Sequence, residues 1–258
     1  MNTLSGKVLV IMGGTGGLGL SAARAFVAAG ARVVVVGREA RKAAAAVKEL
    51  GAAAWGVRGD AAKPRTAARA IAAAVRVFGG FHGLYHVAGG SGRAAGDGPL
   101  HELKDEGWEF TLRLNMTSVF HSNRAAVRQF LHQGTGGTVL NTSSVLGWSP
   151  SPEFFATHAY AAAKAAVIGL TTAAAARYAR DNIRFNVIAP GLVATPMSKR
   201  AQADARILKF IRAKQPLDGG RIGRPEDCDA AAVFFMSDAS RFVTGQVLAV
   251  DGGWTVSS

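Results

Sequence analysis

The sequence lacks the features that mark several large classes of protein. Its one cysteine, Cys228, excludes an internal disulfide and a multi-cysteine zinc site, as is common in a reducing cytosol. No uninterrupted apolar run reaches the roughly 18 residues of a membrane span. The first apolar run has no basic leader and ends in glycines, which is typical of a strand rather than a signal peptide. We therefore expect a cytoplasmic protein with no membrane partner.

Acidic residues are also few. Asp and Glu number 17 against 30 Lys and Arg, a net charge of +13, although charged residues make up only 18% of the chain and disorder is not expected. The basic residues are spread from Lys7 to Arg241, without a dense run containing aromatics. A solvated basic surface explains this distribution, and we expect no nucleic-acid partner. If some of the positive charge serves binding, an anionic cofactor or substrate is a better candidate ligand than nucleic acid.

Short β-branched runs alternate with helical stretches along the whole chain. The expected strands span 7–12, 32–36, 53–57, 83–87, 137–143, 183–189 and 246–250, and the longest expected helix spans about 105–133. Apolar runs of this kind belong to parallel sheets that helices cover on both faces. With no repeat, linker or low-complexity tract, residues 1–258 are predicted to form one doubly wound α/β domain of the Rossmann type, with about seven parallel strands.

A glycine-rich turn, "MGGTGGLGL", follows the first expected strand. Gly13, Gly17 and Gly19 are spaced G-x3-G-x-G, and Gly14, Gly16 and Gly19 also fit G-x-G-x-x-G. Without side chains the backbone can turn tightly, approach a pyrophosphate and present a helix N-terminus to its charge. Since the turn lies between a strand and a helix, it predicts a dinucleotide site.

The end of the second expected strand bears on the choice of dinucleotide. Gly37 and Arg38 occupy the position where NAD-binding sites commonly carry an acid. The Arg38 fork suits a 2′-phosphate, which favours NADP(H), while Glu39 could bind a ribose and leaves NAD(H) possible. Asp60, after the third strand, could accept a hydrogen bond from the adenine amino group or could cap the next helix.

Tyr160 and Lys164 interrupt the alanine-rich stretch "HAYAAAKAAVI". Alanine favours helix, and residues four apart lie on one helical face. The simplest interpretation is an amphipathic helix with a half-buried tyrosine and a solvated lysine. The alternative is a catalytic pair, in which the ammonium favours the phenolate of a group whose pKa is ordinarily about 10.

Motifs over essentially the whole chain then coincide. They are "GGTGGLG" (13–19), "HVAGG" (86–90), "RLNMTSVF" (113–120), "NTSSVLG" (141–147), "YAAAK" (160–164), "IRFNVIAPGLVATPM" (183–197) and "GRPEDCDAAAVFFMSDASRFVTGQVLAVDGG" (223–253). In this order they resemble the short-chain dehydrogenase/reductase family. The resemblance implies an NADP(H)-dependent oxidoreductase that interconverts a carbonyl and a secondary alcohol.

The resemblance also implies roles for four catalytic residues. Tyr160 would be the acid or base, and Lys164 would favour its phenolate and hold the nicotinamide ribose. Ser144, rather than Ser143, would hydrogen-bond the substrate oxygen. Asn115 would bind a structural water and link Lys164 to solvent.

The cofactor would be held by the glycine turn and by residues at the strand ends. Val193 would pair with the nicotinamide carboxamide through its backbone, and Thr195 would contact the carboxamide or the pyrophosphate. The full expected set is Gly13, Thr15, Gly16, Gly17, Leu18, Gly19, Arg38, Asp60, Ala61, Ala88, Gly89, Tyr160, Lys164, Pro190, Gly191, Val193 and Thr195.

The chain departs from the family pattern at three places. Met12 stands where threonine is common, and His86 and Val87 replace two asparagines that tie the central strands. The segment between Ser144 and Tyr160 is longer than usual, so we expect it to bulge at the mouth of the active site. There Trp148, Phe154 and Phe155 would line the substrate pocket with Ser144 and Tyr160, or would only close a loop over the core.

Other chemistries fit less well. "NTSSVLG" is not the G-x-S-x-G elbow of a hydrolase. His82 and His86 would lie roughly 13 Å apart on a strand, too far to share a metal ion, and we expect no metal. A 3-oxoacyl-thioester (acyl-carrier) reductase of the same family and a non-catalytic NADP-binding redox sensor stay as alternatives.

A lid is expected around residues 195–222, and it is rich in positive charge. Its basic residues would steer an acidic small-molecule substrate or an acyl-carrier partner, or would form an ordinary solvated helix face. They are Lys199, Arg200, Arg206, Lys209, Arg212 and Lys214. The resemblance further implies a homotetramer built by helix pairing and by packing of the C-terminal strand.

Overall fold

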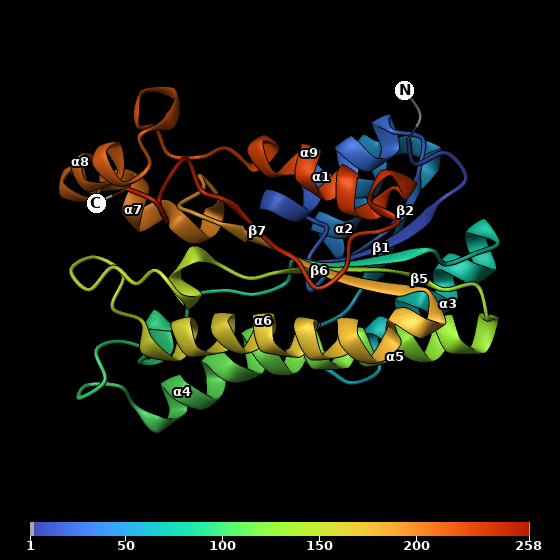
Figure 1. Cartoon of the computed structure of the whole chain (residues 1–258), viewed down its shortest axis with the longest axis horizontal. Coiled ribbons are helices and arrows are strands. Elements are labelled where there is room, and N and C mark those ends of the chain that lie inside the picture. The colour runs from blue at the N-terminus through green and yellow to red at the C-terminus, as the bar shows by residue number, and fades with distance from the viewer. Residues whose placement is uncertain (1–2, 258) are drawn as a thin grey trace.

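All seven strands lie parallel in one sheet, in the order β3-β2-β1-β4-β5-β6-β7 (Figure 1). The computed structural model describes residues 3–257. The strands are β1 (Val8–Met12), β2 (Arg32–Gly37), β3 (Ala54–Arg58), β4 (Gly83–His86), β5 (Gly137–Thr142), β6 (Ile183–Pro190) and β7 (Val247–Val250). The predicted fold class is confirmed, and each strand lies within one residue of its expected position at either end.

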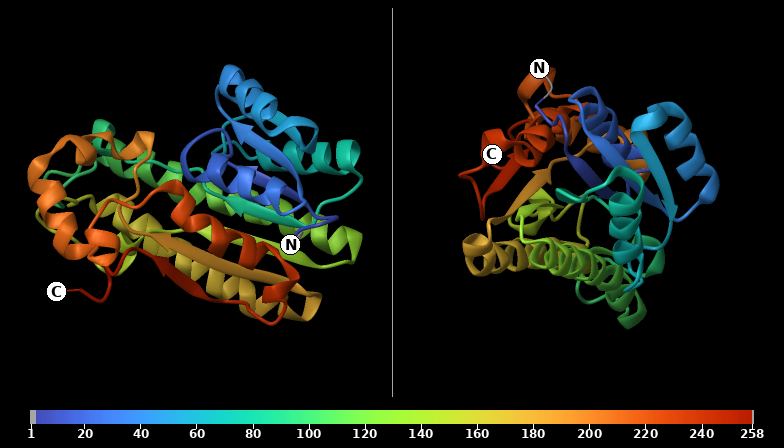
Figure 2. Two further views of the ribbon diagram at one scale, coloured as in Figure 1. Left: turned by 90° about the horizontal axis from the view of Figure 1, so that it is seen from above. Right: turned by 90° about the vertical axis from the view of Figure 1, so that its right-hand side faces the viewer.

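Helices cover both faces of this sheet (Figures 1 and 2). They are α1 (Gly17–Ala28), α2 (Ala40–Leu50), α3 (Thr66–Phe78), α4 (Asp105–Leu112), α5 (Ser118–Gln133), α6 (His158–Tyr178), α7 (Lys199–Ala203), α8 (Ala205–Lys214) and α9 (Asp229–Met236). Side chains alternate along β1, so Leu9 and Ile11 join the core under α1 and α9, while Val8 and Val10 join the core under α3 and α5.

The strand order reverses beside β1, between β2 on one side and β4 on the other. The chain leaves β1, β4, β5 and β6 at the same edge of the sheet, because parallel strands share their carboxyl ends. Helices α7 and α8 lie beyond that edge, near the C-terminal end of the chain (Figure 1). This is the place where open α/β sheets bind ligands.

The expected long helix over 105–133 is interrupted. Helix α4 ends at Leu112, a π-helical turn spans Arg113–Thr117, and α5 follows at Ser118. Asn115 lies in the π turn, and its amide donates to the Thr111 carbonyl at 3.0 Å. Such turns commonly mark functional positions in helices. Composition alone does not reveal the interruption, because every residue in the stretch tolerates a helix.

Helix α6 is unusually apolar. Within the part of the chain that the structure describes, His158–Asp181 is the one segment with the length and mean hydropathy (1.3) of a membrane span. In the sequence Lys164 and Arg177 interrupt it, so it is no uninterrupted apolar run. In the structure α6 lies along the sheet beside β6 and carries Lys164 into a buried position, as the core helix of a globular domain does.

Candidate active site

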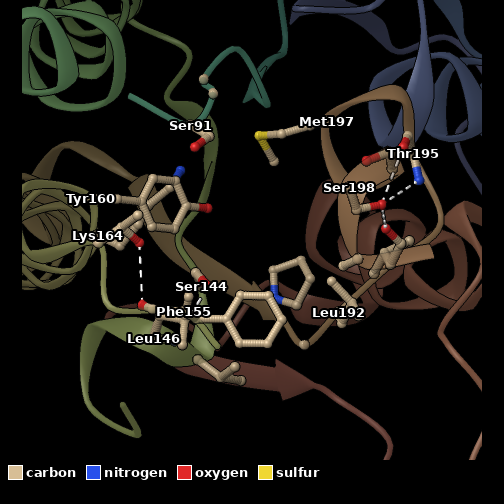
Figure 3. A pocket seen from close by; sticks show the side chains of 18 of the residues that line it. Ser91, Ser144, Leu146, Phe155, Tyr160, Lys164, Leu192, Thr195, Met197 and Ser198 are labelled. Atoms are coloured by element: carbon tan, nitrogen blue, oxygen red, sulfur yellow. Dashed lines mark hydrogen bonds between the residues drawn. The ribbon is translucent and has the colours of Figure 1, made fainter. Parts of the chain in front are cut away.

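Tyr160 and Lys164 lie near the N-terminal end of α6, at the carboxyl edge of the sheet. With Ser144 they line a cavity of about 420 Å³ (Figure 3). The Lys164 ammonium is 5.5 Å from the centroid of the Tyr160 ring. Met197 and Leu192 line other walls of the same space. The expected helical pair is therefore a buried feature of a cavity and not a solvated helix face.

Burial controls the protonation of this pair. It raises the pKa of Tyr160 to about 12, and a hydrogen bond with Ser144 opposes that rise. Burial also lowers the pKa of Lys164 to about 8, because a charged ammonium loses hydration inside the protein. At neutral pH the phenol is therefore a proton donor, and the lysine still carries its charge.

Two consecutive serines at the end of β5 have different partners. The Ser143 hydroxyl donates to the Lys164 carbonyl at 2.7 Å, so it fixes β5 to α6. Ser144 lines the cavity, and its hydroxyl oxygen accepts only a long 3.3 Å bond from the Leu146 N–H. The Lys164 ammonium donates to the Thr142 carbonyl at 2.9 Å. Ser144 is thus the serine of the two whose hydroxyl is available to a ligand.

Asn115 is buried behind this site and does not line the cavity. Its side chain exchanges two hydrogen bonds with the backbone of Gly90, at 3.0 and 2.9 Å. Gly89 lies between it and Lys164: a Cβ there would be 2.7 Å from Asn115 Oδ1 and 3.5 Å from Lys164 Nζ. Asn115 therefore fixes the loop after β4 against the π turn, close to the lysine.

His86 forms a hydrogen-bonded bridge at the end of β4. Its pKa is lowered to about 3 by burial and by the charge of Lys164, so the ring is neutral. The Ala88 carbonyl only accepts, so Nε2 carries the proton and donates at 2.9 Å, while Ser122 lies 2.7 Å from Nδ1. A histidine thus links β4, the following turn and α5. Met12 packs in the core beneath.

No metal site accompanies His86. His82 accepts the Val8 N–H through Nδ1 at 3.0 Å. Among residues 3–257 no group of three or more His, Cys, Asp or Glu side chains is arranged to hold a metal ion.

The glycine turn has the shape that a pyrophosphate requires. A Cβ on Gly19 would lie 2.3 Å from the Gly13 carbonyl oxygen, and one on Gly13 would lie 2.7 Å from the Ala88 nitrogen. At Gly16 nothing lies within 4 Å of that position. No side chain caps the N-terminus of α1 and its first turn contains no acid. The turn therefore leaves the positive end of α1 open to an anion, which fits a dinucleotide.

The end of β2 presents Arg38 to solvent. Gly37 must lack a side chain, since a Cβ there would lie 2.3 Å from Thr15 Oγ1. Glu39 is paired with Lys42 at 2.6 Å, whereas no ion pair involves Arg38 in the described part of the chain. Asp60 accepts the Ala62 N–H at 3.0 Å within the turn before α3, and it does not cap that helix, because no side chain caps α3 and its N-cap residue is Arg65.

The loop after β6 forms the opposite side of the cavity. Val193 and Gly223 form an isolated parallel β-bridge. Its two hydrogen bonds run from the Gly223 N–H to the Leu192 carbonyl and from the Ala194 N–H to the Gly223 carbonyl. That arrangement leaves the Val193 N–H out of the bridge. Thr195 and Ser198 form a capping box.

Of the expected cofactor residues, the cavity is lined by Leu18, Gly89, Tyr160, Lys164, Pro190, Gly191, Val193 and Thr195. The remaining ones lie outside it.

The expected substrate residues are only partly gathered here. Trp148 is 44% exposed and does not line the cavity, and Phe154 packs in a cluster with Phe210 instead. The neighbouring Phe155 lines the cavity with Trp254, their rings 5.8 Å apart. Of the three aromatic residues expected in the bulge, Phe155 is thus the one that lines the cavity. The cavity is also lined by Arg200, which the sequence named only as one of the basic residues of the lid, and by residues that it did not single out, among them Ser91, Arg93, Leu192, Met197 and Trp254.

A second missed residue is Asp97, in the loop after β4. It is 4% exposed, and its carboxylate accepts the N–H groups of Ala159 and Tyr160, both at 3.0 Å. It lies 63 residues from Tyr160 in the chain. Since the segment around it reads as an ordinary polar loop, no local signal in the sequence identifies it.

Comparisons with known proteins agree with this geometry. A family model described as enoyl-(acyl carrier protein) reductase matches residues 13–255. The chain is 40% identical over 237 residues to the inactive 2-(S)-hydroxypropyl-CoM dehydrogenase 2 of Xanthobacter autotrophicus, covering 90% of this chain and 99% of that one. It is 35% identical over 256 residues to a 2,5-dichloro-2,5-cyclohexadiene-1,4-diol dehydrogenase of Sphingobium indicum, covering 99% of both chains. A solved short-chain type dehydrogenase/reductase from Mycobacterium ulcerans matches with a TM-score of 0.90 at 34% identity, covering 98% of this chain and 91% of that one.

Proposed function

Because the chain belongs to the short-chain dehydrogenase/reductase family, and is thus an oxidoreductase of CH–OH groups with a nicotinamide dinucleotide cofactor, we propose that it interconverts a carbonyl and a secondary alcohol with NADP(H). Tyr160 is the acid and base of this proposal. The observation that carries it is the meeting of Tyr160, Ser144 and Lys164 in one cavity at the carboxyl edge of the sheet.

In the direction of reduction, the Ser144 hydroxyl donates a hydrogen bond to the substrate carbonyl oxygen. A nicotinamide dinucleotide held by the glycine turn and the loop after β6 would provide the hydride for the carbonyl carbon. Tyr160 gives its proton to the oxygen as negative charge develops there, which completes the alcohol. In oxidation the tyrosinate takes that proton back. A phenol with a pKa near 12 is protonated at neutral pH and suits the first direction.

Lys164 acts on Tyr160 through its charge. With a pKa of about 8 it is an ammonium at neutral pH, 5.5 Å from the phenol ring. That charge stabilises the tyrosinate left after proton transfer, and it does so most in a buried site where screening is weak. The bond to the Thr142 carbonyl holds the ammonium in place.

Arg38 supports NADP(H) over NAD(H). The phosphate-binding alternative requires a free guanidinium at the end of β2, and the exposed Arg38 provides one. The competing acid, Glu39, is held by Lys42. A planar fork binds a phosphate through two parallel hydrogen bonds.

A thioester substrate is the second candidate, favoured by the basic lid and by the description of the matching family model. A non-catalytic NADP-binding sensor is the third, and the relative named as inactive keeps it in view. The retained Tyr160 and Lys164 argue against the third.

A homotetramer is part of the same proposal. Two apolar surfaces support it: Trp108, Phe120 and Leu131 are exposed on α4 and α5, and Phe242 and Leu248 are exposed at β7. Faces of this kind are commonly covered by another subunit. Light scattering of the wild type and of Phe242→Glu measures the assembly.

The decisive experiment is consumption of NADPH by the purified protein with neutral ketones, oxo acids, 3-oxoacyl thioesters and enoyl thioesters. Ketone reduction with stoichiometric alcohol supports the proposal. Turnover of thioesters alone replaces it with the second candidate, and tight NADPH binding without any turnover replaces it with the third.

A further inference from the structure

Two arginines from different segments converge on one carbonyl at the wall of the cavity. Arg93, in the loop after β4, donates to the Phe154 carbonyl through Nη2 at 3.1 Å. Arg200, on α7, donates to the same carbonyl through Nη2 at 3.0 Å. Phe154 belongs to the long segment after β5. Three segments that are far apart in the sequence therefore meet at a single oxygen atom.

These guanidinium groups have no carboxylate to balance them. Among residues 3–257 no ion pair involves Arg93 or Arg200. The acid whose charge acts on Arg93 is Asp97, and its two oxygens are bound to the N-terminal N–H groups of α6. Burial and the charge of Arg200 lower the pKa of Arg93. Two like charges thus lie close together beside a partly apolar cavity.

The Phe154 carbonyl accepts a hydrogen bond from one nitrogen, Nη2, of each guanidinium. Each guanidinium has five N–H donors in a planar fork, and neither guanidinium makes another hydrogen bond with the described residues. Arg200 also lies over the Phe155 ring, 5.8 Å from its centroid, which limits the positions of its head group. Both residues line the cavity that contains Ser144 and Tyr160. Both side chains are exposed at the rim of the cavity, so their remaining donors are available to an oxyanion at its mouth.

We propose that Arg93 and Arg200 form a subsite for a carboxylate carried by the substrate. This inference rests on the proposed function and names its substrate class, an oxo acid or hydroxy acid. Neither guanidinium contacts Ser144 or Tyr160, which hold the reacting oxygen. A ring that bears the carbonyl and the carboxylate at opposite ends would let one group reach Ser144 and Tyr160 while the other reaches the two arginines.

The other lid cations do not take part. Arg206 is paired with Asp204, and Lys214 donates to the Ser257 carbonyl. None of them lines the cavity, and neither does Lys199, the residue before Arg200 on the same helix. Of the lid cations, Arg200 is thus the one that would bind the carboxylate, and this binding does not require the expected steering of the substrate by the whole lid. Lys199→Gln removes one positive charge beside the site and is the matched control.

The test compares 4-oxocyclohexanecarboxylate with its methyl ester, which has the same ring without the charge. In the wild type kcat/KM is expected to favour the acid. Arg93→Gln and Arg200→Gln should each lower kcat/KM for the acid by roughly ten- to a hundred-fold, the usual effect of a lost charged hydrogen bond. The ester should change by less than about two-fold, and Lys199→Gln should leave both substrates near wild type.

Binding of an unreactive acid separates this inference from the proposed function. Titration calorimetry with cyclohexanecarboxylate, in the presence of NADP⁺, needs no turnover. The wild type should bind it and should not bind cyclohexanecarboxamide comparably, and each arginine variant should weaken binding by a similar ten-fold or more. Arg200→Lys, which keeps the charge, should restore part of the affinity.

Equal losses for the acid and the ester in both arginine variants would mean that the arginines only fix the Phe154 loop, and the inference would be overturned. Equal wild-type binding of the acid and the amide would overturn it as well. If the acid binds through the arginines but neither ketone is reduced, the proposed reaction fails and the subsite stands.

Discussion

Asp97 holds the first turn of α6 by two hydrogen bonds, one to the Ala159 N–H and one to the backbone N–H of Tyr160, both at 3.0 Å. The acid comes from the loop that also carries Arg93, so one loop contacts the proton donor and lines the cavity. A carboxylate at a helix N-terminus is stabilised by the helix dipole. Asp97 is thus a positioning residue for Tyr160.

Asp97→Ala removes both acceptors and should cost about 0.5–2 kcal/mol of unfolding free energy, as the loss of a helix cap does. Asp97→Asn keeps an acceptor and should fold nearly as well. Asp97→Asn removes a negative charge near Tyr160, which should lower the pKa of the phenol. The basic limb of the pH–rate profile should therefore shift to lower pH. If stability falls in both variants and neither profile moves, Asp97 has only a structural role.

Tyr160→Phe tests the proton transfer. It removes one oxygen from a half-buried ring, and kcat should fall roughly a hundred- to ten-thousand-fold, the usual contribution of general acid–base catalysis. The melting temperature and the dinucleotide affinity, measured in parallel, should stay close to wild type. Retention of more than about a tenth of kcat, with chemistry rate-limiting, would assign the proton transfer to another group.

Arg38 tests the cofactor preference. The ratio of kcat/KM for NADPH to that for NADH should exceed one in the wild type. Arg38→Asp should reduce or reverse the ratio, because attraction of a phosphate is replaced by repulsion. Arg41→Asp, at an exposed position in the first turn of α2, is the control for charge alone. A wild-type preference for NADH would contradict the assignment.

His86 makes stability depend on pH. The buried ring has a pKa of about 3, against 6.5 for an ordinary histidine. Between these values the unfolded chain binds a proton that the folded chain does not, so stability is complete above about pH 6.5 and is lost as the pH falls toward 3. The loss is at most about 1.4 kcal/mol per pH unit for one group.

Urea unfolding at pH 7 and pH 5 measures this effect. His86→Asn restores the amide that the family commonly has and removes the titrating group. The wild type should therefore lose up to about 2 kcal/mol more than the variant over this interval. Equal pH dependence in the two proteins would show that folding does not lower the pKa of His86.

Much of this protein could be predicted from its sequence because the deciding signals are local. Runs such as "RVVVV" specify buried parallel strands, and the spacing of Gly13, Gly17 and Gly19 specifies a turn that a Cβ would obstruct. Tyr160 and Lys164 are four residues apart, so any helix that forms over this stretch places them on one face. Local geometry and covalent connectivity therefore determine the sheet, the glycine turn and the pair on α6.

Tertiary structure alone decided the substrate side of the cavity. Asp97 reaches Tyr160 across 63 residues, Arg93 and Arg200 meet at a carbonyl that neither adjoins in sequence, and Phe155 replaces its neighbour Phe154 in the lining. Which side of a loop faces a cavity depends on how three separate segments pack against one another. Since polar loop residues carry no periodicity, their sequence does not record the partners that packing gives them.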